Sequence, residues 1–389
     1  MKTYDWIVVG GGVAGAALSY ELANRTLSVL RLEQDAAPEN ATRYSYGGIA
    51  YWSGTTPLTR QLCQEGIEIH RNLSAELDSD TQFRELDLLL PIAQGSDPET
   101  VAASYRGFAV PPSLLDADAA CELEPLLNRE AIAAALTVRH GSVSPDLLVK
   151  AYTQAFTRAG GTVEIAQVTA LVDSQGQGTV TTTAESYTAA NVVVCAGSMS
   201  RSLLKTANVT VPCYFTHAEL IETEPVALKL RSLVMPAETQ RFQMEAEAGK
   251  SEKVPLWDQQ TEEVAPPVLD PGAIQFIDGR IRIGQISRTL ANPQAQIDAA
   301  QSEADIRAAV GQFLPALRDV PGTWHRCLVA FSGDRLPLIG TVPDHNHLHI
   351  FAGFSNPFAI LPPLAKRFAN HASGEPDDLI AQLALGRFA

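Results

Sequence analysis

The sequence predicts an α/β protein of two domains, one of which binds a dinucleotide. Residues 5–32 read in turn as a buried strand, a glycine-rich turn, a helix and a second strand. The chain has 389 residues, too many for one compact domain and comfortable for two. Beyond residue 213, alternating apolar and polar residues predict strands at 218–222, 273–277 and 280–286.

The glycine-rich turn carries the pattern G-x-G-x-x-G at Gly10, Gly12 and Gly15. In that pattern the first glycine permits the tight turn, the second lets backbone approach a pyrophosphate, and the third lets helix and strand pack closely. The following helix directs free N–H groups and its positive dipole end at the phosphates. Glu33, 18 residues past Gly15, can accept hydrogen bonds from ribose hydroxyls and disfavours NADP. We expect FAD or NAD here; the alternative is a glycine turn inside an ordinary α/β domain.

Composition and charge argue against several classes of protein, including nucleic-acid-binding and membrane-spanning proteins. The formal net charge of -15 argues against nucleic acid and anionic membrane surfaces as partners. Five cysteines, none in a C-x-x-C pair, do not predict a disulfide framework. No apolar run reaches the ~18 residues of a membrane span. Because the dinucleotide motif follows residue 5, no room is left for a signal peptide, and we expect a cytoplasmic protein.

Several elements between these motifs are predicted from spacing and end signals. Asp116 or Asp118 is expected to cap a helix over 116–127. The Pro- and Glu-rich segment 236–271 is interpreted as a mobile lid or a surface insertion. The closing helix is predicted to begin near Leu361, with two prolines in its first turn, where proline is tolerated.

Glycine and aromatic residues gather after the first unit. Gly47 and Gly48 let backbone approach a flat ring, and Tyr44, Tyr51 and Trp52 lie close by in sequence. The aromatic side chains line a flavin or substrate pocket, or alternatively they pack under a loop.

Six short motifs, spread in a fixed order through nearly the whole chain, help to decide between FAD and NAD as the cofactor. They stand at residues 8–15, 45–49, 140–145, 192–197, 333–340 and 352–355. Together they resemble the glycine oxidase and sarcosine oxidase group of FAD-dependent oxidoreductases, within the D-amino-acid-oxidase superfamily. The resemblance favours FAD over NAD.

The resemblance implies a discontinuous, Rossmann-like FAD-binding domain with an inserted substrate domain whose large sheet is mostly antiparallel. The FAD domain would comprise 1–80, 140–211 and 326–389, and the substrate domain 81–139 and 212–325.

The implied reaction oxidises a small-molecule amine or amino acid by hydride transfer from a C–H beside the nitrogen to flavin N5, with oxygen or an electron carrier as acceptor. Two rivals are a 2-hydroxy-acid dehydrogenase and a flavin-carrying subunit without its own substrate.

The resemblance also assigns site residues. The candidate catalytic residues are Arg282, Tyr51 and Trp52. Residues near 353–362 would direct a helix N-terminus at the flavin. The expected FAD contacts are Gly10, Gly12, Val13, Ala14, Gly15, Glu33, Gln34, Tyr44, Ser45, Gly47, Gly48, Ile49, Val168, Ala196, Gly197, Cys327, Gly353, Phe354, Ser355, Asn356 and Phe358.

Cys327 and Val329 stand at two positions where sarcosine-oxidase-like and glycine-oxidase-like members differ. Cys327 stands seven residues before Asp334, where sarcosine-oxidase-like members bind the flavin covalently; the alternative is a small buried hydrophobe. Glycine-oxidase-like members carry a carboxylate-binding arginine at the place of Val329, and valine cannot bind a carboxylate. The substrate is therefore expected to be a more apolar amine, or to have its carboxylate bound elsewhere.

Arg282 stands where sarcosine-oxidase-like members carry a lysine that assists oxygen reduction beside the flavin. A fixed cation near N5 favours developing negative charge. The alternative is a solvated strand charge, and Arg280 would share its face. The histidines at 345, 347 and 349 are interpreted as a surface turn, and no metal site is expected.

Overall fold

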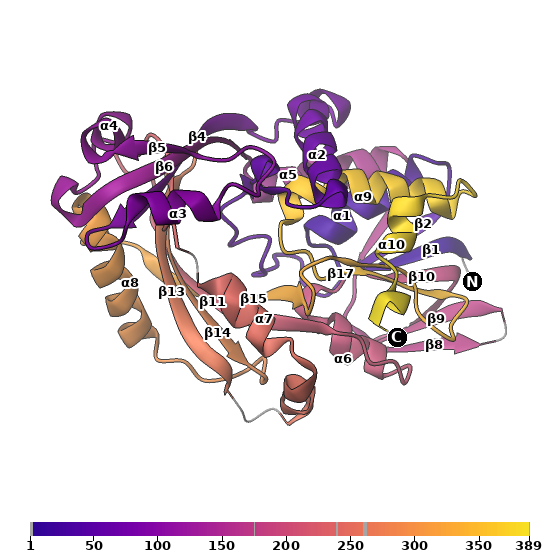
Figure 1. Cartoon of the computed structure of the whole chain (residues 1–389). Helices are drawn as coiled ribbons and strands as arrows, with labels where there is room; N and C mark the ends of the chain where they lie inside the picture. The colour runs from indigo at the N-terminus through magenta and orange to yellow at the C-terminus, as the bar shows by residue number, and fades with distance from the viewer. Residues whose placement is uncertain (1–2, 175, 239, 260–262, 389) are drawn as a thin grey trace.

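The computed structural model describes residues 3–174, 176–238, 240–259 and 263–388. Two sheets dominate it and lie side by side in Figure 1, the N-terminal one with α1, α5 and α9 and the other with α8. The predicted α/β class and the mostly antiparallel second sheet are both confirmed.

The first sheet has eight strands within the described ranges. Its neighbouring strands β17, β10, β1, β2 and β7 all run parallel, as a strand–helix–strand unit requires. In spatial order the path is β16 (Leu338–Thr341), β17 (Leu348–Ala352), β10 (Ser186–Val194), β1 (Tyr4–Val9), β2 (Val29–Glu33) and β7 (Thr162–Ile165), and the hairpin β8 (Val168–Ser174) and β9 (Gln177–Thr182) joins at β10.

The second sheet has nine strands in the part of the chain that is described, and its long neighbours pair antiparallel. In spatial order the path is β15 (Thr323–Ser332), β11 (Cys213–Glu222), β14 (Ile281–Leu290), β13 (Glu263–Gln275), β12 (Leu233–Val234), β4 (Arg84–Ala93), β6 (Ile132–Ser142) and β3 (Gly48–Ile49), with β5 (Ser113–Asp116) on β6.

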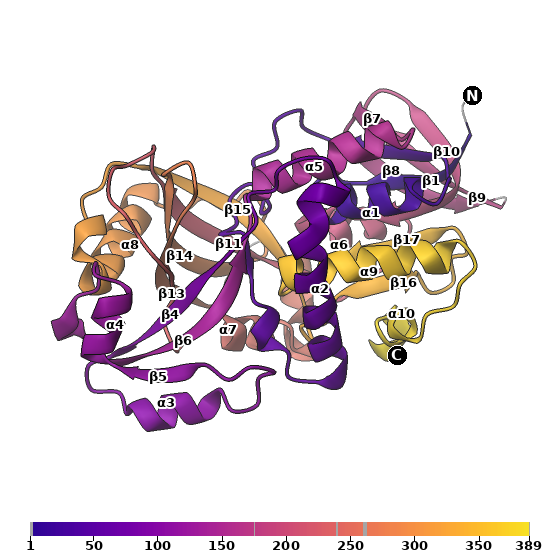
Figure 2. The same cartoon turned by 90° about the horizontal axis from the view of Figure 1, so that it is seen from above.

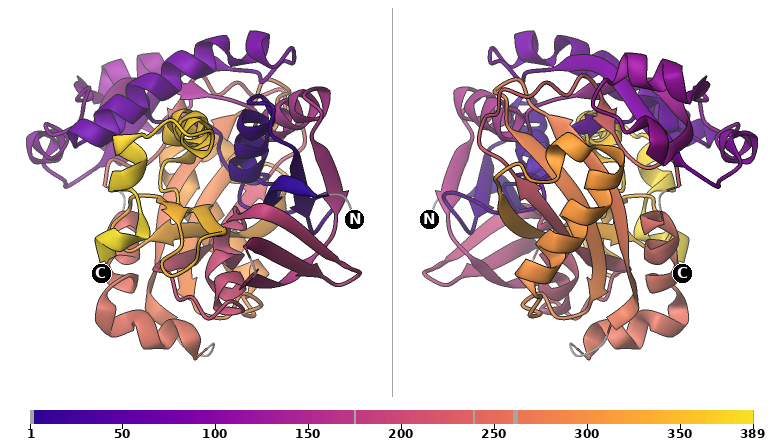
Figure 3. Two further views of the ribbon diagram at one scale, coloured as in Figure 1. Left: turned by 90° about the vertical axis from the view of Figure 1, so that its right-hand side faces the viewer. Right: turned by 90° about the vertical axis from the view of Figure 1, so that its left-hand side faces the viewer.

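Helices cover the two sheets separately. Figure 3 shows α8 crossing a face of the second sheet, and Figure 2 shows α2 crossing α9. The helices are α1 (Val13–Ala23), α2 (Pro57–Glu76), α3 (Pro98–Ser104), α4 (Ala117–Leu123), α5 (Pro145–Arg158), α6 (Ser200–Lys205), α7 (Arg241–Ala248), α8 (Ala299–Phe313), α9 (Pro357–Ala372) and α10 (Asp378–Gln382). Asp116 caps α4 by accepting from the Ala119 N–H, so the first of the two predicted caps is the one used.

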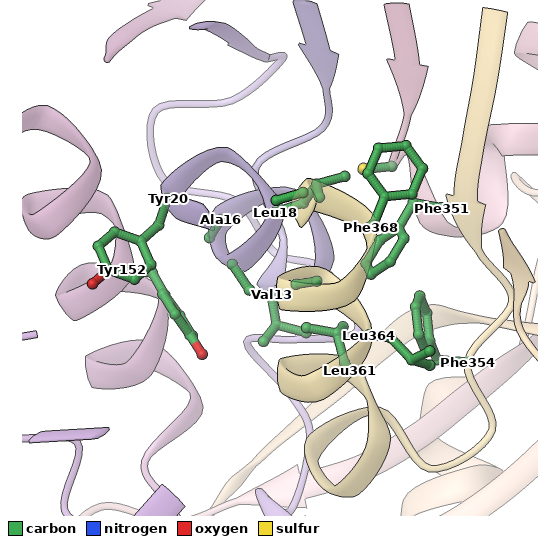
Figure 4. Packing of buried hydrophobic residues seen from close by; sticks show 14 of the residues in the cluster. Val13, Ala16, Leu18, Tyr20, Tyr152, Phe351, Phe354, Leu361, Leu364 and Phe368 are labelled. Atoms are coloured by element: carbon green, nitrogen blue, oxygen red, sulfur yellow. The ribbon is translucent and has the colours of Figure 1, made fainter. Parts of the chain in front are cut away.

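The small residues of α1 let it sit deep between α5 and α9. Ala16 and Leu18 are fully buried, and α9 contributes Leu361, Leu364 and Phe368 to the same cluster (Figure 4). This packing fixes the start of α1, and with it the glycine turn, against the first sheet.

Two predictions about boundaries need correction. The predicted boundary at residue 326 falls inside β15, which pairs with β11 and belongs to the second sheet; the division into domains otherwise stays a prediction. Segment 236–271 is not an insertion, because its described part contains α7 and most of β13, an interior strand. The prolines of β13 stand beside register shifts at 263–265, 265–268 and 269–272, which are bulges that tolerate proline in a sheet. Residues 239 and 260–262 lie outside the described residues.

The closing helix also begins earlier than predicted. Helix α9 starts at Pro357, so Pro362 and Pro363 lie inside it rather than in its first turn. Proline lacks the N–H that would bond to the carbonyl four residues earlier. His70 of α2 compensates, because its Nε2 donates to the Phe358 carbonyl at 2.7 Å.

Candidate active site

A cavity of about 1560 Å³ is lined by residues of both sheets. Drug-sized ligands occupy roughly 300–1,000 Å³, so a dinucleotide and a substrate fit together here. Of the predicted contacts, those that line it are Gly10, Gly12, Val13, Ala14, Glu33, Gln34, Tyr44, Ser45, Gly48, Trp52, Val168, Ala196, Gly197, Cys327, Gly353, Phe354, Ser355, Asn356 and Phe358.

The nucleotide end of the cavity is built from backbone. Gly10 has φ +112°, a left-handed conformation that side chains resist, and a Cβ on Gly15 would lie 1.9 Å from the Gly10 carbonyl oxygen. The Gly11 N–H donates to Glu33 Oε2 at 2.6 Å, which holds the carboxylate at the end of β2 beside the turn. These features match the roles that the motif predicts for a pyrophosphate and a ribose.

The N-terminus of α9 lies at the same cavity. Gly353 has φ +75°, and the first turn of α9 contains no acidic residue. Ser355 Oγ is buried and has no hydrogen-bond partner among the described residues. An orphaned hydroxyl beside free helix N–H groups suits a polar, negatively polarised ligand edge, so the residues present fit a flavin dinucleotide.

Another part of the cavity lining is aromatic and apolar. Trp52, Tyr105 and Phe108 line it, with ring centroids 5.3 Å apart for Trp52–Phe108 and 5.2 Å for Tyr105–Phe108. Trp52 Nε1 donates to His140 Nδ1 at 3.1 Å, which fixes the indole plane. Burial lowers the pKa of His140 to about 3, so the imidazole is neutral and holds the tryptophan rather than exchanging protons.

The family described as FAD dependent oxidoreductase (DAO) matches residues 5–371. The chain belongs to this family. Glycine oxidase of Geobacillus kaustophilus is 26% identical over 230 residues, which cover 56% of this chain and 61% of that protein. Monomeric sarcosine oxidase of Streptomyces avermitilis is 30% identical over 214 residues, covering 52% and 54%. The chain thus aligns with little more than half the length of these two relatives.

Solved structures agree on the fold. Glycine oxidase from Geobacillus kaustophilus superposes with a TM-score of 0.81 at 20% identity, covering 99% of both chains. L-proline dehydrogenase from P. horikoshii superposes with a TM-score of 0.80 at 18% identity, covering 100% of this chain and 98% of that one. Membership of the FAD dependent oxidoreductase family supports FAD as the cofactor, and its binding at the glycine turn stays a prediction.

Five predicted site residues stand outside the cavity lining. Gly15 lies beneath the turn, and Gly47, at φ +65°, packs where a Cβ would meet the Val143 carbonyl at 2.2 Å. Ile49 pairs in the sheet with Gly141, and Tyr51 packs against the α1–α9 cluster. These positions support the cavity wall from behind; the fifth residue is Arg282.

Arg282 is fully buried, so its interpretation as a solvated strand charge is wrong. Its Nε donates to Glu222 Oε2 at 2.7 Å, and it also donates to the Ser45 carbonyl. Arg43 and Arg280 bind the same carboxylate at 2.7 Å and 3.3 Å, so Arg280 does share the face of Arg282. Although burial opposes it, hydrogen bonds from Arg43 and attraction to Arg282 lower the pKa of Glu222 to about 2. Arg282 therefore anchors the loop before Gly47 rather than reaching the cavity.

Cys327 and Val329 both line the cavity. Burial raises the pKa of the Cys327 thiol to about 12. All five cysteines, which lie in the described ranges, are free thiols. Val329 contributes an apolar side chain to the lining, as its residue type predicts.

The polar residues that line the cavity and that the sequence reasoning did not name as site residues include Arg241, Gln285, Arg335 and His140. Arg335 lies inside the quoted motif at 333–340, and its charge was the available signal. Arg241 was hidden in the segment interpreted as an insertion. His140 began a quoted motif, but its bond to Trp52 joins positions 88 residues apart.

Two structural searches of the described residues were negative. No group of three or more His, Cys, Asp or Glu side chains there is placed to hold a metal ion. Within the same residues, every helix is too short or too polar to cross a membrane.

Proposed function

We propose that this FAD-dependent oxidoreductase oxidises an amine or amino acid at its C–N bond. The observation that carries the proposal is a single cavity that joins a dinucleotide cradle to an aromatic, largely apolar chamber. When bound, FAD supplies the hydride acceptor, flavin N5 taking the hydride from the C–H beside the substrate nitrogen. Oxygen or an electron carrier then removes the electrons.

The residues of the chain have positioning roles in this proposal. The N-terminus of α9 and Ser355 Oγ stabilise negative charge at the pyrimidine edge of the ring. Trp52, held by neutral His140, forms a wall that orients the substrate and excludes water. The names of similar proteins support the reaction class, since they include glycine oxidase, sarcosine oxidase and N-methyl-L-tryptophan oxidase.

The test is a product assay with FAD-loaded protein. Amines, amino acids and matched 2-hydroxy acids are each supplied with oxygen or a dye acceptor. We expect a carbonyl product and released amine from at least one nitrogen compound, and peroxide when oxygen is the acceptor. Turnover of hydroxy acids alone would replace the proposal with a hydroxy-acid dehydrogenase.

The proposal extends to how the flavin is held. Cys327 lines the cavity at the position that sarcosine-oxidase-like members use for covalent attachment. Acid precipitation separates the two cases, because covalent flavin stays with the pellet and Cys327→Ser would release it. Yellow supernatant from the wild-type protein would leave Cys327 as a core residue.

A further inference from the structure

Two arginines that line the cavity contact one aromatic ring. Arg241 Cζ lies 4.9 Å and Arg335 Cζ 4.1 Å from the centre of the Phe242 ring, and all three residues line the cavity. Arg335 is exposed and Arg241 half-buried, so a ligand in the cavity can reach both guanidinium groups. Both guanidinium groups are therefore close enough to the ring for a cation–π interaction.

Most N–H donors of these arginines are unused. Among the described residues, the Arg335 side chain forms no ion pair within 4.0 Å and donates no hydrogen bond, and Arg241 has one ion pair, with Glu245 at 3.6 Å. The contrast with Arg282 is sharp, since Arg282 binds Glu222 at 2.7 Å. Planar guanidinium groups with free donors are suited to bidentate binding of a carboxylate.

Three acidic residues, Glu245, Asp270 and Asp334, also line the cavity, and two of them have partners other than these arginine side chains. Asp270 accepts from the backbone N–H groups of Gln240 and Arg241 at 3.2 Å and 3.4 Å, which caps the start of α7. Asp334 pairs with Arg387 at 2.7 Å on the far side of the turn that carries Arg335. Burial raises the pKa of Glu245, which weakens it as a counter-ion for Arg241.

The backbone at Arg335 adds an independent observation. Its φ is +65°, in the left-handed region that is unfavourable for a non-glycine residue. Glycine would fit this turn without that cost, yet the position carries a long cation whose side chain lines the cavity. Among the described non-glycine residues with positive φ, Arg335 is the one that lines the cavity.

We propose that Arg241 and Arg335 together bind the carboxylate of the substrate. The proposal rests on the proposed function and narrows it, because the substrate is then an amino acid rather than a simple amine. The aromatic wall at Trp52 takes its apolar group. The pair would supply the carboxylate site that Val329 cannot.

Calorimetric titration of the FAD-loaded full chain tests the site without turnover. Benzoate and its uncharged analogue benzamide are the probes. We expect benzoate to bind and benzamide to bind at least about tenfold more weakly, since hydrogen bonds to charged groups contribute about 1.5–3 kcal/mol. Arg241→Gln and Arg335→Gln should each weaken benzoate binding by about ten- to a hundredfold.

The controls separate a lost contact from a damaged fold. Arg129→Gln removes an exposed arginine that pairs with Asp118 outside the cavity, and it should leave benzoate binding unchanged. Arg335→Gly relieves the left-handed strain while deleting the cation, so it should be at least as stable as the wild type and still bind benzoate poorly.

The outcomes for the two proposals differ. Equal binding of benzoate and benzamide by the wild type, or wild-type benzoate affinity in both arginine variants, overturns the carboxylate site. Arginine-dependent benzoate binding in a protein that oxidises no nitrogen compound supports the site and overturns the proposed function alone.

Discussion

The two ends of the cavity are built in different ways. At the nucleotide end, Gly10 and Gly15 allow the backbone to form a tight turn that is packed against the following helix. One short stretch of the chain contains this turn, the helix α1 and the acidic residue Glu33. At the substrate end, Trp52 and Arg335 come from segments almost three hundred residues apart in sequence. A contiguous motif therefore defines the kind of cofactor, whereas tertiary structure assembles the groups that select the substrate.

The largest expected effect is the loss of FAD binding when the glycine turn at the nucleotide end is disrupted. Gly15→Ala places a Cβ 1.9 Å from the Gly10 carbonyl oxygen, and backbone cannot yield there cheaply. We expect loss of bound FAD, measured by visible absorbance after desalting. Gly107→Ala is the matched control, because a Cβ there meets nothing within 4 Å. Wild-type FAD content in Gly15→Ala would contradict the assignment of the turn.

The next effect concerns the buried arginine behind the cavity. Glu222→Gln leaves Arg282 without its counter-ion, and breaking a buried pair costs about 3–5 kcal/mol. Urea unfolding should show that loss. The control Glu303→Gln breaks a more exposed pair with Arg307, expected to cost less than about 1 kcal/mol. Equal small losses in both variants would mean that Arg282 is not held as described.

Lowering the pH should destabilise the fold through His70, which donates a hydrogen bond to the Phe358 carbonyl of α9. Burial lowers the pKa of His70 from 6.5 to about 4, so the unfolded chain binds the proton first as the pH falls. Stability is therefore full above pH 6.5 and declines between about pH 6.5 and 4, by about 3 kcal/mol for this group. His70→Gln should flatten that part of the pH–stability curve. An unchanged slope in the variant would show that His70 titrates normally.

The smallest expected effect is a change in substrate binding when the aromatic wall at Trp52 is altered. Trp52→Phe keeps an aromatic wall but leaves His140 Nδ1 buried without its donor, at a cost of about 1–3 kcal/mol. We expect a higher KM for the preferred substrate with unchanged FAD binding. Trp324→Phe is the control, since the Trp324 indole N–H has no partner among the described residues and the residue does not line the cavity. A shift in FAD affinity instead of KM would place Trp52 at the wrong end.

Sequence patterns predicted those parts of the protein whose structure depends on residues close together in the chain. The first strand–helix–strand unit and its glycines follow from spacing alone, and Glu33 does bond to the Gly11 N–H beside the turn. Residues 353–356, which precede α9, line the cavity, and their contact with FAD stays a prediction. The helix itself starts at Pro357 rather than near Leu361.

Residues that depend on pairing between distant strands were harder to predict. Nothing in the sequence near Arg282 shows that Glu222 lies opposite it, because β11 and β14 meet only in the folded sheet. The same holds for Pro362, whose missing N–H donor is tolerated within α9 because His70 of another helix donates to the Phe358 carbonyl. Prolines in segment 236–271 suggested an insertion, whereas bulges in β13 accommodate them.

The most direct test of the whole account is anaerobic mixing of FAD-loaded protein with amines and amino acids. The account predicts that the visible flavin absorbance bleaches with at least one amino acid that has an apolar side chain. Bleaching should be slower with the corresponding decarboxylated amine, since that amine lacks the carboxylate. A flavin that stays oxidised with every nitrogen compound would contradict the claim that the two ends of this cavity serve one oxidation reaction.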